Sequence, residues 1–224
     1  MSFGALLTDS QGVPFYIDGT RPLTLVNKVV YSVPSPGGLR SIDLYPNDGV
    51  MRFVFIQDNA GTTSNYCSWL QMDSNTWRLY MNYQTGTSVT VFIFGYANQP
   101  VPAWGVAIWD AQNNCILTNE SKVLRDVTSL GDQSSDTNSG FRYTGTLAGS
   151  WAVAPFWSGL FTGVDNSTGQ ARPVSATFYL AAHFNGSQTF LRSGIGQGSV
   201  DGNVSNPSYS NSRCLLTCIN VDKY

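Results

Sequence analysis

The chain has 224 residues, of which 12% are charged and 13% aromatic, and its formal net charge at pH 7 is −2. This charge balance lacks the basic surface that nucleic acid binding requires, and no apolar run approaches the roughly 18 residues of a membrane span, so we expect neither partner. With Glu120 as the sole glutamate and with abundant Gly, Ser, Thr and Asn, the composition predicts an all-β protein with few or no helices.

The chain opens with a stretch that is repeated. Residues 3–26 recur 101 positions later as residues 104–127, without a gap. Both copies have an aspartate at the position where a type I turn favours a side-chain hydrogen-bond acceptor. Three residues later both have a Gly or Asn, which tolerates the left-handed backbone conformation. These turn residues are Asp9 and Gly12 in the first copy and Asp110 and Asn113 in the second. Each copy is therefore predicted to form a β-hairpin with a bulged turn.

Strand candidates separated by turn residues about every ten positions predict a β-sandwich in the first half. The candidates are 3–8, 13–17, 23–33, 39–45, 50–57, 66–72, 77–83 and 88–96. Segments 50–56 and 88–95 are the most apolar of them and are expected to be the central strands.

Pro100 and Pro102 then interrupt any ladder, because neither can donate a backbone hydrogen bond. We therefore predict two tandem β-sandwich-like domains, residues 1–100 and 101–224, joined by a short and nearly rigid linker. The alternative is that the second hairpin completes the sheet of the first domain, in which case contacts between 104–118 and the first hundred residues would reduce the count to one domain.

The second half is longer than the first, and its extra length lies in polar segments that we expect to be surface loops, 131–140 and 192–213. Candidate binding positions on these loops are Gly131, Ser139, Gly196, Asn203 and Tyr209. Between them, residues 150–161 are rich in aromatic side chains, which form either core or a contact with another subunit. Trp151 and Trp157 are the candidate aromatic binding residues in this segment.

Metal and cofactor signals are weak. The four cysteines are expected to be reduced thiols, with Cys67 and Cys115 as small core side chains. Cys214 and Cys218 would need His183 to make even a partial zinc site, and a packed histidine is the favoured interpretation. The glycines of 194–198 indicate loop flexibility, because no helix follows to support a phosphate site. We predict no metal and no cofactor.

Catalytic residues are equally hard to find. A glycosidase needs a pair of carboxylic groups, and most aspartates here, including Asp48 and Asp58, lie in turn contexts. A Ser-His-Asp triad would depend on His183 alone, without the usual nucleophile elbow. The sequence therefore predicts a protein that is not an enzyme and has no catalytic residue.

The doubled hairpin carries a family resemblance. Both copies begin with an aromatic residue followed by Gly, continue with alternating apolar residues and end in Asp or Asn followed two residues later by Thr or Ser. They run from Phe3-Gly4 to Asp18-Gly19-Thr20 and from Trp104-Gly105 to Asn119-Glu120-Ser121, and residues 91–95 close the first unit. This pattern resembles the small two-unit tail proteins of bacteriophages, over residues 1–127 more than over the rest.

The resemblance implies a structural protein of the tail tip or fibre, made in the host cytoplasm and located in the virion tail. Its expected partners are other tail proteins, which domain 1–100 would contact, and a host surface receptor or glycan, which the loops of domain 101–224 would contact. Few charges and many aromatic residues further predict a homo-oligomer, with a trimer around the tail axis as the expected form. The alternative function is a carbohydrate-binding, lectin-like module without enzymatic activity.

Overall fold

The computed structural model describes residues 21–60, 66–131, 144–198, 203–212 and 215–224, and in these ranges it contains strands and no helix. The all-β prediction is therefore confirmed. Six of the predicted strands of the first half are found within two residues of their expected ends, while the predicted strands 3–8 and 13–17 lie outside the described residues. The six are β1 (Thr24–Ser32), β2 (Gly38–Pro46), β3 (Arg52–Asp58), β4 (Cys67–Asp73), β5 (Thr76–Tyr83) and β6 (Ser88–Gly95).

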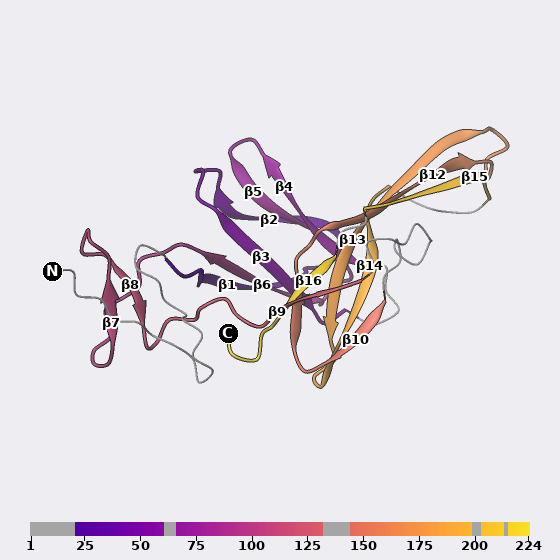
Figure 1. Cartoon of the computed structure of the whole chain (residues 1–224). Coiled ribbons are helices and arrows are strands. Elements are labelled where there is room, and N and C mark those ends of the chain that lie inside the picture. The colour runs from indigo at the N-terminus through magenta and orange to yellow at the C-terminus, as the bar shows by residue number, and fades with distance from the viewer. Residues whose placement is uncertain (1–20, 61–65, 132–143, 199–202, 213–214) are drawn as a thin grey trace.

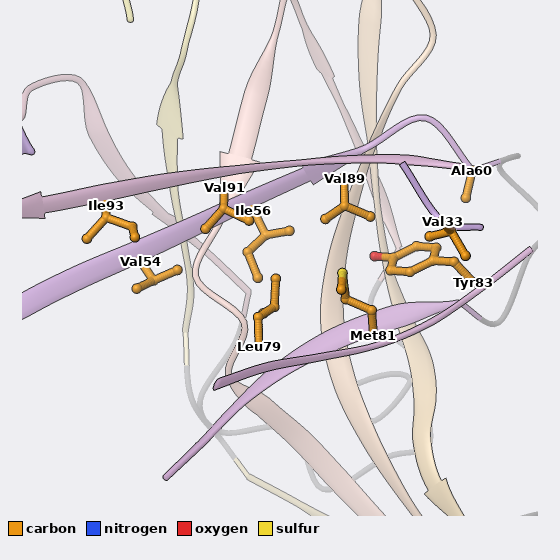
Figure 2. Close-up of a cluster of buried hydrophobic side chains, with 10 residues drawn as sticks. All are labelled: Val33, Val54, Ile56, Ala60, Leu79, Met81, Tyr83, Val89, Val91 and Ile93. Carbon is orange, nitrogen blue, oxygen red and sulfur yellow. The ribbon is translucent and has the colours of Figure 1, made fainter. Parts of the chain in front are cut away.

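These six strands form a two-layer sandwich. One layer has the antiparallel order β1-β6-β3 and the other the order β2-β5-β4. Figure 2 shows the side chains of the two layers pointing toward each other in the space between them. Leu79 and Met81 of β5 meet Val54, Ile56 and Val91 there, and Leu79, Met81 and Val91 are fully buried. In the middle of β3, β5 and β6, every second residue is thus an apolar side chain that points into the space between the layers, as the two-residue period of a strand requires.

The other face of β3 and β6 is covered by the second half of the chain. Phe55, Phe92 and Phe94 on this face pack against Ala152 and Ile219, and all five side chains are at most 3% exposed. The covering strands are β11 (Trp151–Val153) and β16 (Leu216–Asn220). Central strands buried on both faces explain why segments 50–56 and 88–95 are nearly continuous apolar runs.

Strands from both halves also share one sheet of eleven strands. β3 pairs with β11 through Ile56 and Val153, and with β13 (Arg172–Phe184) in parallel through Asp58 and His183. The sheet continues through β14 (Gln188–Gly198) to β10 (Gly145–Ala148) on one side, and through β16 to β9 (Val127–Leu130) on the other. The predicted division into domains at residue 100 is therefore not confirmed, because hydrogen bonding and apolar packing both cross it.

Two further parts extend from opposite ends of this body (Figure 1). At one end, the β7 (Ala107–Trp109) and β8 (Cys115–Thr118) strands form a separate hairpin. At the other end, β12 (Trp157–Asp165), the first half of β13 and β15 (Val204–Asn211) form a three-stranded projection, which we call the arm.

The β7–β8 hairpin has the predicted bulged turn. The Asp110 side chain accepts hydrogen bonds from the backbone N–H groups of Gln112 and Asn114, and Asn113 has a φ of 63°. The turn prediction is thus confirmed for the second copy of the repeat. The first copy, and with it the predicted superposition of the two hairpins, lies outside the described residues.

Candidate functional site

A buried polar cluster lies where the two halves meet. Asp58 ends β3, and its carboxylate receives two hydrogen bonds from Nη2 of Arg192 on β14, at 3.0 and 2.9 Å. The Tyr83 hydroxyl donates to the same carboxylate at 3.1 Å and accepts in turn from the Ser68 hydroxyl at 3.2 Å. All four residues are at most 4% exposed. The cluster therefore joins β3, β4 and β5 of the sandwich to β14 of the second half.

Asp58 has a second, local role. Its Oδ1 atom accepts a hydrogen bond from the Ala60 backbone N–H at 2.9 Å, as a turn-capping aspartate does. The prediction of turn caps is confirmed for Asp58, as it is for Asp48, which accepts from the Val50 N–H at 3.0 Å. The carboxylate of Asp58 thus fixes the chain direction after β3 and binds the guanidinium from the other half at the same time.

His183 borders this cluster as a packed side chain. Its Nδ1 atom lies 3.6 Å from Asp58 Oδ1, which is beyond hydrogen-bond reach, and its ring stacks on Phe190 with centroids 6.1 Å apart. The residue is 7% exposed, so the packed interpretation is confirmed. Within the described ranges no group of three or more His, Cys, Asp or Glu side chains is placed to hold a metal, and Cys214 lies outside those ranges.

Burial away from water determines the pKa values of the tyrosine and cysteine side chains near the cluster. Burial raises the pKa of the Tyr83 hydroxyl well above its ordinary value, and it does the same to the pKa of the Cys67 thiol. Cys218, also buried, has a pKa raised to about 11 by burial. Both thiols are therefore protonated and unreactive at neutral pH. Cys67 and Cys115 are buried, as predicted, and Cys218 is buried as well; none of the three forms a disulfide.

Next to the cluster, three aromatic rings stack across the junction. Trp69 on β4 lies between Tyr80 of β5 and Tyr179 of β13, with centroid distances of 5.6 and 5.3 Å and near-parallel planes. Trp69 is 2% exposed, whereas the two tyrosines are half-buried. Gly196 of β14 lies against this stack, since a Cβ atom there would be 2.5 Å from a Tyr179 ring carbon and 2.9 Å from Trp69.

The predicted loop 192–213 is wrong for its described residues. Residues 192–198 belong to β14, and 204–211 form β15. Gly196 serves packing and not loop flexibility, because the Tyr179 and Trp69 rings approach its backbone too closely for a Cβ atom. The Ser- and Asn-rich composition of β15 reflects an edge strand whose residues 206–210 are exposed.

The remaining candidate binding residues are not brought together. Gly131 follows β9, Ser139 lies outside the described residues, and Asn203 directly precedes β15. Trp151 packs beside the cluster of Leu180 and Leu191, and its Nε1 atom donates to the Ala148 carbonyl at 2.8 Å. Residues 150–161 are thus mostly core, with Phe156 and Trp157 exposed by 51% and 40%.

Tyr209 and Trp157 both belong to the arm. The Tyr209 ring packs on Phe161 with centroids 5.1 Å apart, and Trp157 pairs with Tyr179 at the base of the arm. Of the predicted candidates, Tyr209, Trp157 and Asn203 lie on the arm, where the Asn203 carbonyl accepts a hydrogen bond from the Asn166 N–H at 3.0 Å, and Gly196 lies beside it.

No family model, no curated protein and no solved structure matches the chain. Among the described residues, no helix is long and apolar enough to cross a membrane.

Sequence reasoning missed Asp58 and Arg192 as a pair. The sequence offered one signal, because Asp58 follows an apolar run and Arg192 follows Leu191 in a chain with only 12% charged residues. The pairing itself joins residues 134 positions apart, which no local pattern reveals.

Proposed function

We propose that the protein is a structural component of a bacteriophage tail tip or fibre, and that the arm is the surface through which it assembles with its neighbours. The observation that carries this proposal is that a three-stranded sheet projects beyond the body (Figure 1). A small projecting sheet gains little from its own core, and its retention is explained when a neighbour covers it.

The composition of the arm supports a role in contact with protein. Asp165 and Arg172, opposite each other at its tip, are the only charged residues in its strands. The exposed face carries a row of hydroxyl side chains, Thr162, Ser175 and Ser208, that are cross-strand neighbours. Projecting sheets of monomeric proteins are usually protected by charges, and this one is not.

The backbone of β15, at the edge of the arm, hinders the addition of another strand, so a neighbour is expected to contact the face of the arm's sheet. Asn206 has a φ of 51°, and Pro207 beside it cannot donate a backbone hydrogen bond. The pairing of β15 with β12 is irregular at this point. A bulge and a proline at an edge hinder the addition of another strand, so the hydroxyl face is the surface left for a neighbour.

A direct test places negative charge on that face. The double variant Thr162→Glu with Ser175→Glu should dissociate the homo-oligomer, because carboxylates of like charge would then lie in a contact that excludes water. Light scattering measures the resulting loss of mass. The matched control, Ser41→Glu with Gln71→Glu, changes two exposed residues of β2 and β4 and should leave the mass unchanged. A wild-type chain that is monomeric at all concentrations, or that is absent from purified virions by mass spectrometry, contradicts the proposal.

A carbohydrate-binding function is the second candidate, and one groove favours it. The groove lies at the open end of the sandwich, holds about 320 Å³ and is lined in part by Tyr45, Arg52 and Tyr96. Arg52 lies over the Tyr45 ring, with its guanidinium carbon 4.8 Å from the ring centroid, and binds Asp48 through two hydrogen bonds of 2.7 and 2.8 Å. Aromatic faces beside fixed hydrogen-bonding groups are typical of sugar sites.

The second candidate predicts that glycan binding, measured on a glycan array and by calorimetry, is lost in Tyr96→Ala. Tyr96 is 45% exposed, so its removal leaves the fold intact. Trp157→Ala serves as the control on the arm. Binding lost in Trp157→Ala and kept in Tyr96→Ala would move the sugar site from the groove to the arm.

A further inference from the structure

The groove at the open end of the sandwich has a single charged residue in its lining. Ten described residues line it, and among them Arg52 alone carries a charged side chain. Lys28 follows the lining residue Asn27 but lies on the other face of the sheet, where its Nζ atom is 5.0 Å from the centroid of the Phe92 ring. The electrostatic character of the groove therefore depends on how the Arg52 guanidinium is paired.

The Asp48 carboxylate pairs with both terminal nitrogens of Arg52. Nη1 donates to Oδ1 at 2.7 Å and Nη2 donates to Oδ2 at 2.8 Å, which is the bidentate arrangement that binds a carboxylate most specifically. The Arg52 side chain is only 17% exposed and also lies over the Tyr45 ring, so its position is fixed from two sides. An acidic ligand could use these two nitrogens only by displacing Asp48.

Asp48 is held in this position by its own turn. Its Oδ1 atom accepts a second hydrogen bond from the Val50 N–H at 3.0 Å, and Gly49 between them has a φ of 75°. The hydrogen bonds from Arg52 and from Val50 hold the pKa of the Asp48 carboxyl well below its ordinary value, so the pair persists in mildly acidic solution. Asp48 is not part of the groove lining and acts on a ligand only through Arg52.

The rest of the lining suits an uncharged polar ligand. Tyr96, Val26 and Val50 are exposed apolar side chains, and Asn27 carries an amide that can both donate and accept hydrogen bonds. A sugar ring combines apolar C–H faces with hydroxyl groups at its edges, which matches this combination. A carboxylate would instead lose its hydration beside apolar side chains and a guanidinium that is already paired.

We propose that the groove selects neutral glycans against acidic ones, and that Asp48 sets this selectivity by occupying the guanidinium of Arg52. The inference rests on the carbohydrate-binding candidate function and specifies the ligand class of the same groove. Asp48 is a positioning residue in this scheme, because it decides the charge that Arg52 presents without touching the ligand. Removal of its charge should therefore open the groove to acidic glycans although no lining residue has changed.

The test uses the full chain and an array of glycan pairs that differ only in a terminal N-acetylneuraminic acid. The wild-type protein should bind the neutral member of a pair more tightly. Asp48→Asn should bind the acidic member about tenfold more tightly than the wild type does, as expected for one newly available hydrogen bond to a charged group. This gain should shrink with added salt, because the exposed guanidinium is screened. Asparagine keeps the oxygen that caps the turn, so the variant should fold, which circular dichroism checks.

Asp165→Asn is the matched control on the arm. Asp165 caps its turn in the same way, by accepting a hydrogen bond from the Ser167 N–H at 2.8 Å, and its substitution changes the net charge by the same amount. This variant should keep the wild-type selectivity. An equal gain of acidic binding in Asp165→Asn, or no gain in Asp48→Asn, would overturn the role assigned to Asp48.

The array also separates failure of this inference from failure of the carbohydrate function. A wild-type protein that prefers the acidic member of the pairs, and loses binding in Tyr96→Ala, overturns the selectivity while the groove remains a sugar site. A wild-type protein that binds no glycan, or whose binding survives Tyr96→Ala, contradicts the groove as a sugar site and overturns the inference with it.

Discussion

The sandwich body and the arm are built from the same kind of strand, but they differ in how many faces are covered. β3 and β6 have an apolar cluster on each face, and a buried ion pair closes the end of β3. In the arm, one small cluster around Phe161, Ala176 and Phe178 lies on one face, and the other face carries hydroxyl groups. We therefore expect the body to unfold as a unit and the arm to open locally.

This difference assigns separate roles to the two regions. The core and the sheet of the body both include residues from either side of residue 100, so we expect the body to be rigid, and the proposal expects a neighbour to cover the arm. The following predictions separate these roles, beginning with the body.

The largest effect is expected from Arg192→Met. The substitution leaves the Asp58 carboxylate buried without its guanidinium, which should lower the free energy of unfolding by roughly 3–5 kcal/mol. Chemical denaturation measures this loss. In the double variant with Asp58→Asn the uncompensated charge is gone, so much of the stability should return. A single variant as stable as the wild type would show that the ion pair does not fasten the two halves.

Two matched phenylalanines test whether the arm opens separately. Phe94 is fully buried in the body and Phe161 is 3% exposed in the arm. Phe94→Ala should cost about 3–5 kcal/mol of global stability. Phe161→Ala should instead accelerate hydrogen exchange in β12 and β15 and leave the denaturation midpoint of the body nearly unchanged. Equal loss of global stability in the two variants would mean that body and arm form one cooperative unit.

A smaller effect is expected at the base of the arm. In Gly196→Ala the new methyl group would lie within 3 Å of the Tyr179 and Trp69 rings, so the aromatic stack must shift, at a cost of roughly 1–3 kcal/mol. Gly95→Ala is the matched control, because its nearest neighbours would be 3.4 Å away or more. Thermal unfolding followed by near-UV circular dichroism reports both stability and the stack. Similar melting temperatures for the two variants would contradict this role of Gly196.

The sequence predicted the strands of the first half much better than β14 and β15, for a physical reason. The strands of residues 21–95 either alternate apolar and polar residues or, at 50–56 and 88–95, form short and nearly continuous apolar runs, and turn residues separate them, so local patterning suffices to find them. β14 and β15 are rich in Gly, Ser and Asn, and their strand conformation depends on pairing with β13 and β12. A loop was predicted there because such pairing has no local signal.

The candidate site shows the same limit. The sequence marked Asp58 as a turn cap, which is a local property, but its partners Tyr83 and Arg192 come from other strands. Gly196 was identified as a binding position on a loop, and only the packing of Trp69 and Tyr179 reveals its role. The proposed assembly role of the arm stays a prediction until the charged-face variants are measured.

The smallest effect concerns acid and the β7–β8 hairpin, which lies at the end of the molecule opposite the arm (Figure 1). Hydrogen bonds from the Asn114 side chain and backbone, with smaller contributions from Arg21 and Gln112, lower the pKa of Asp110 from 3.8 to about 2. A carboxyl group whose pKa is lower in the folded state stabilises that state above its unfolded pKa. The hairpin turn should therefore be intact above pH 3.8 and lose this stabilisation as the pH falls to about 2.

The Gln112 and Asn114 amide resonances measure this directly, because both N–H groups donate to the Asp110 carboxylate. Their chemical shifts should titrate together with a midpoint near 2, and Asp110→Asn should remove the transition. The arm supplies the comparison, since hydrogen bonds from Ser167 also lower the pKa of Asp165 at its tip. If the hairpin amides titrated near the ordinary aspartate value, the turn would not be held by this carboxylate.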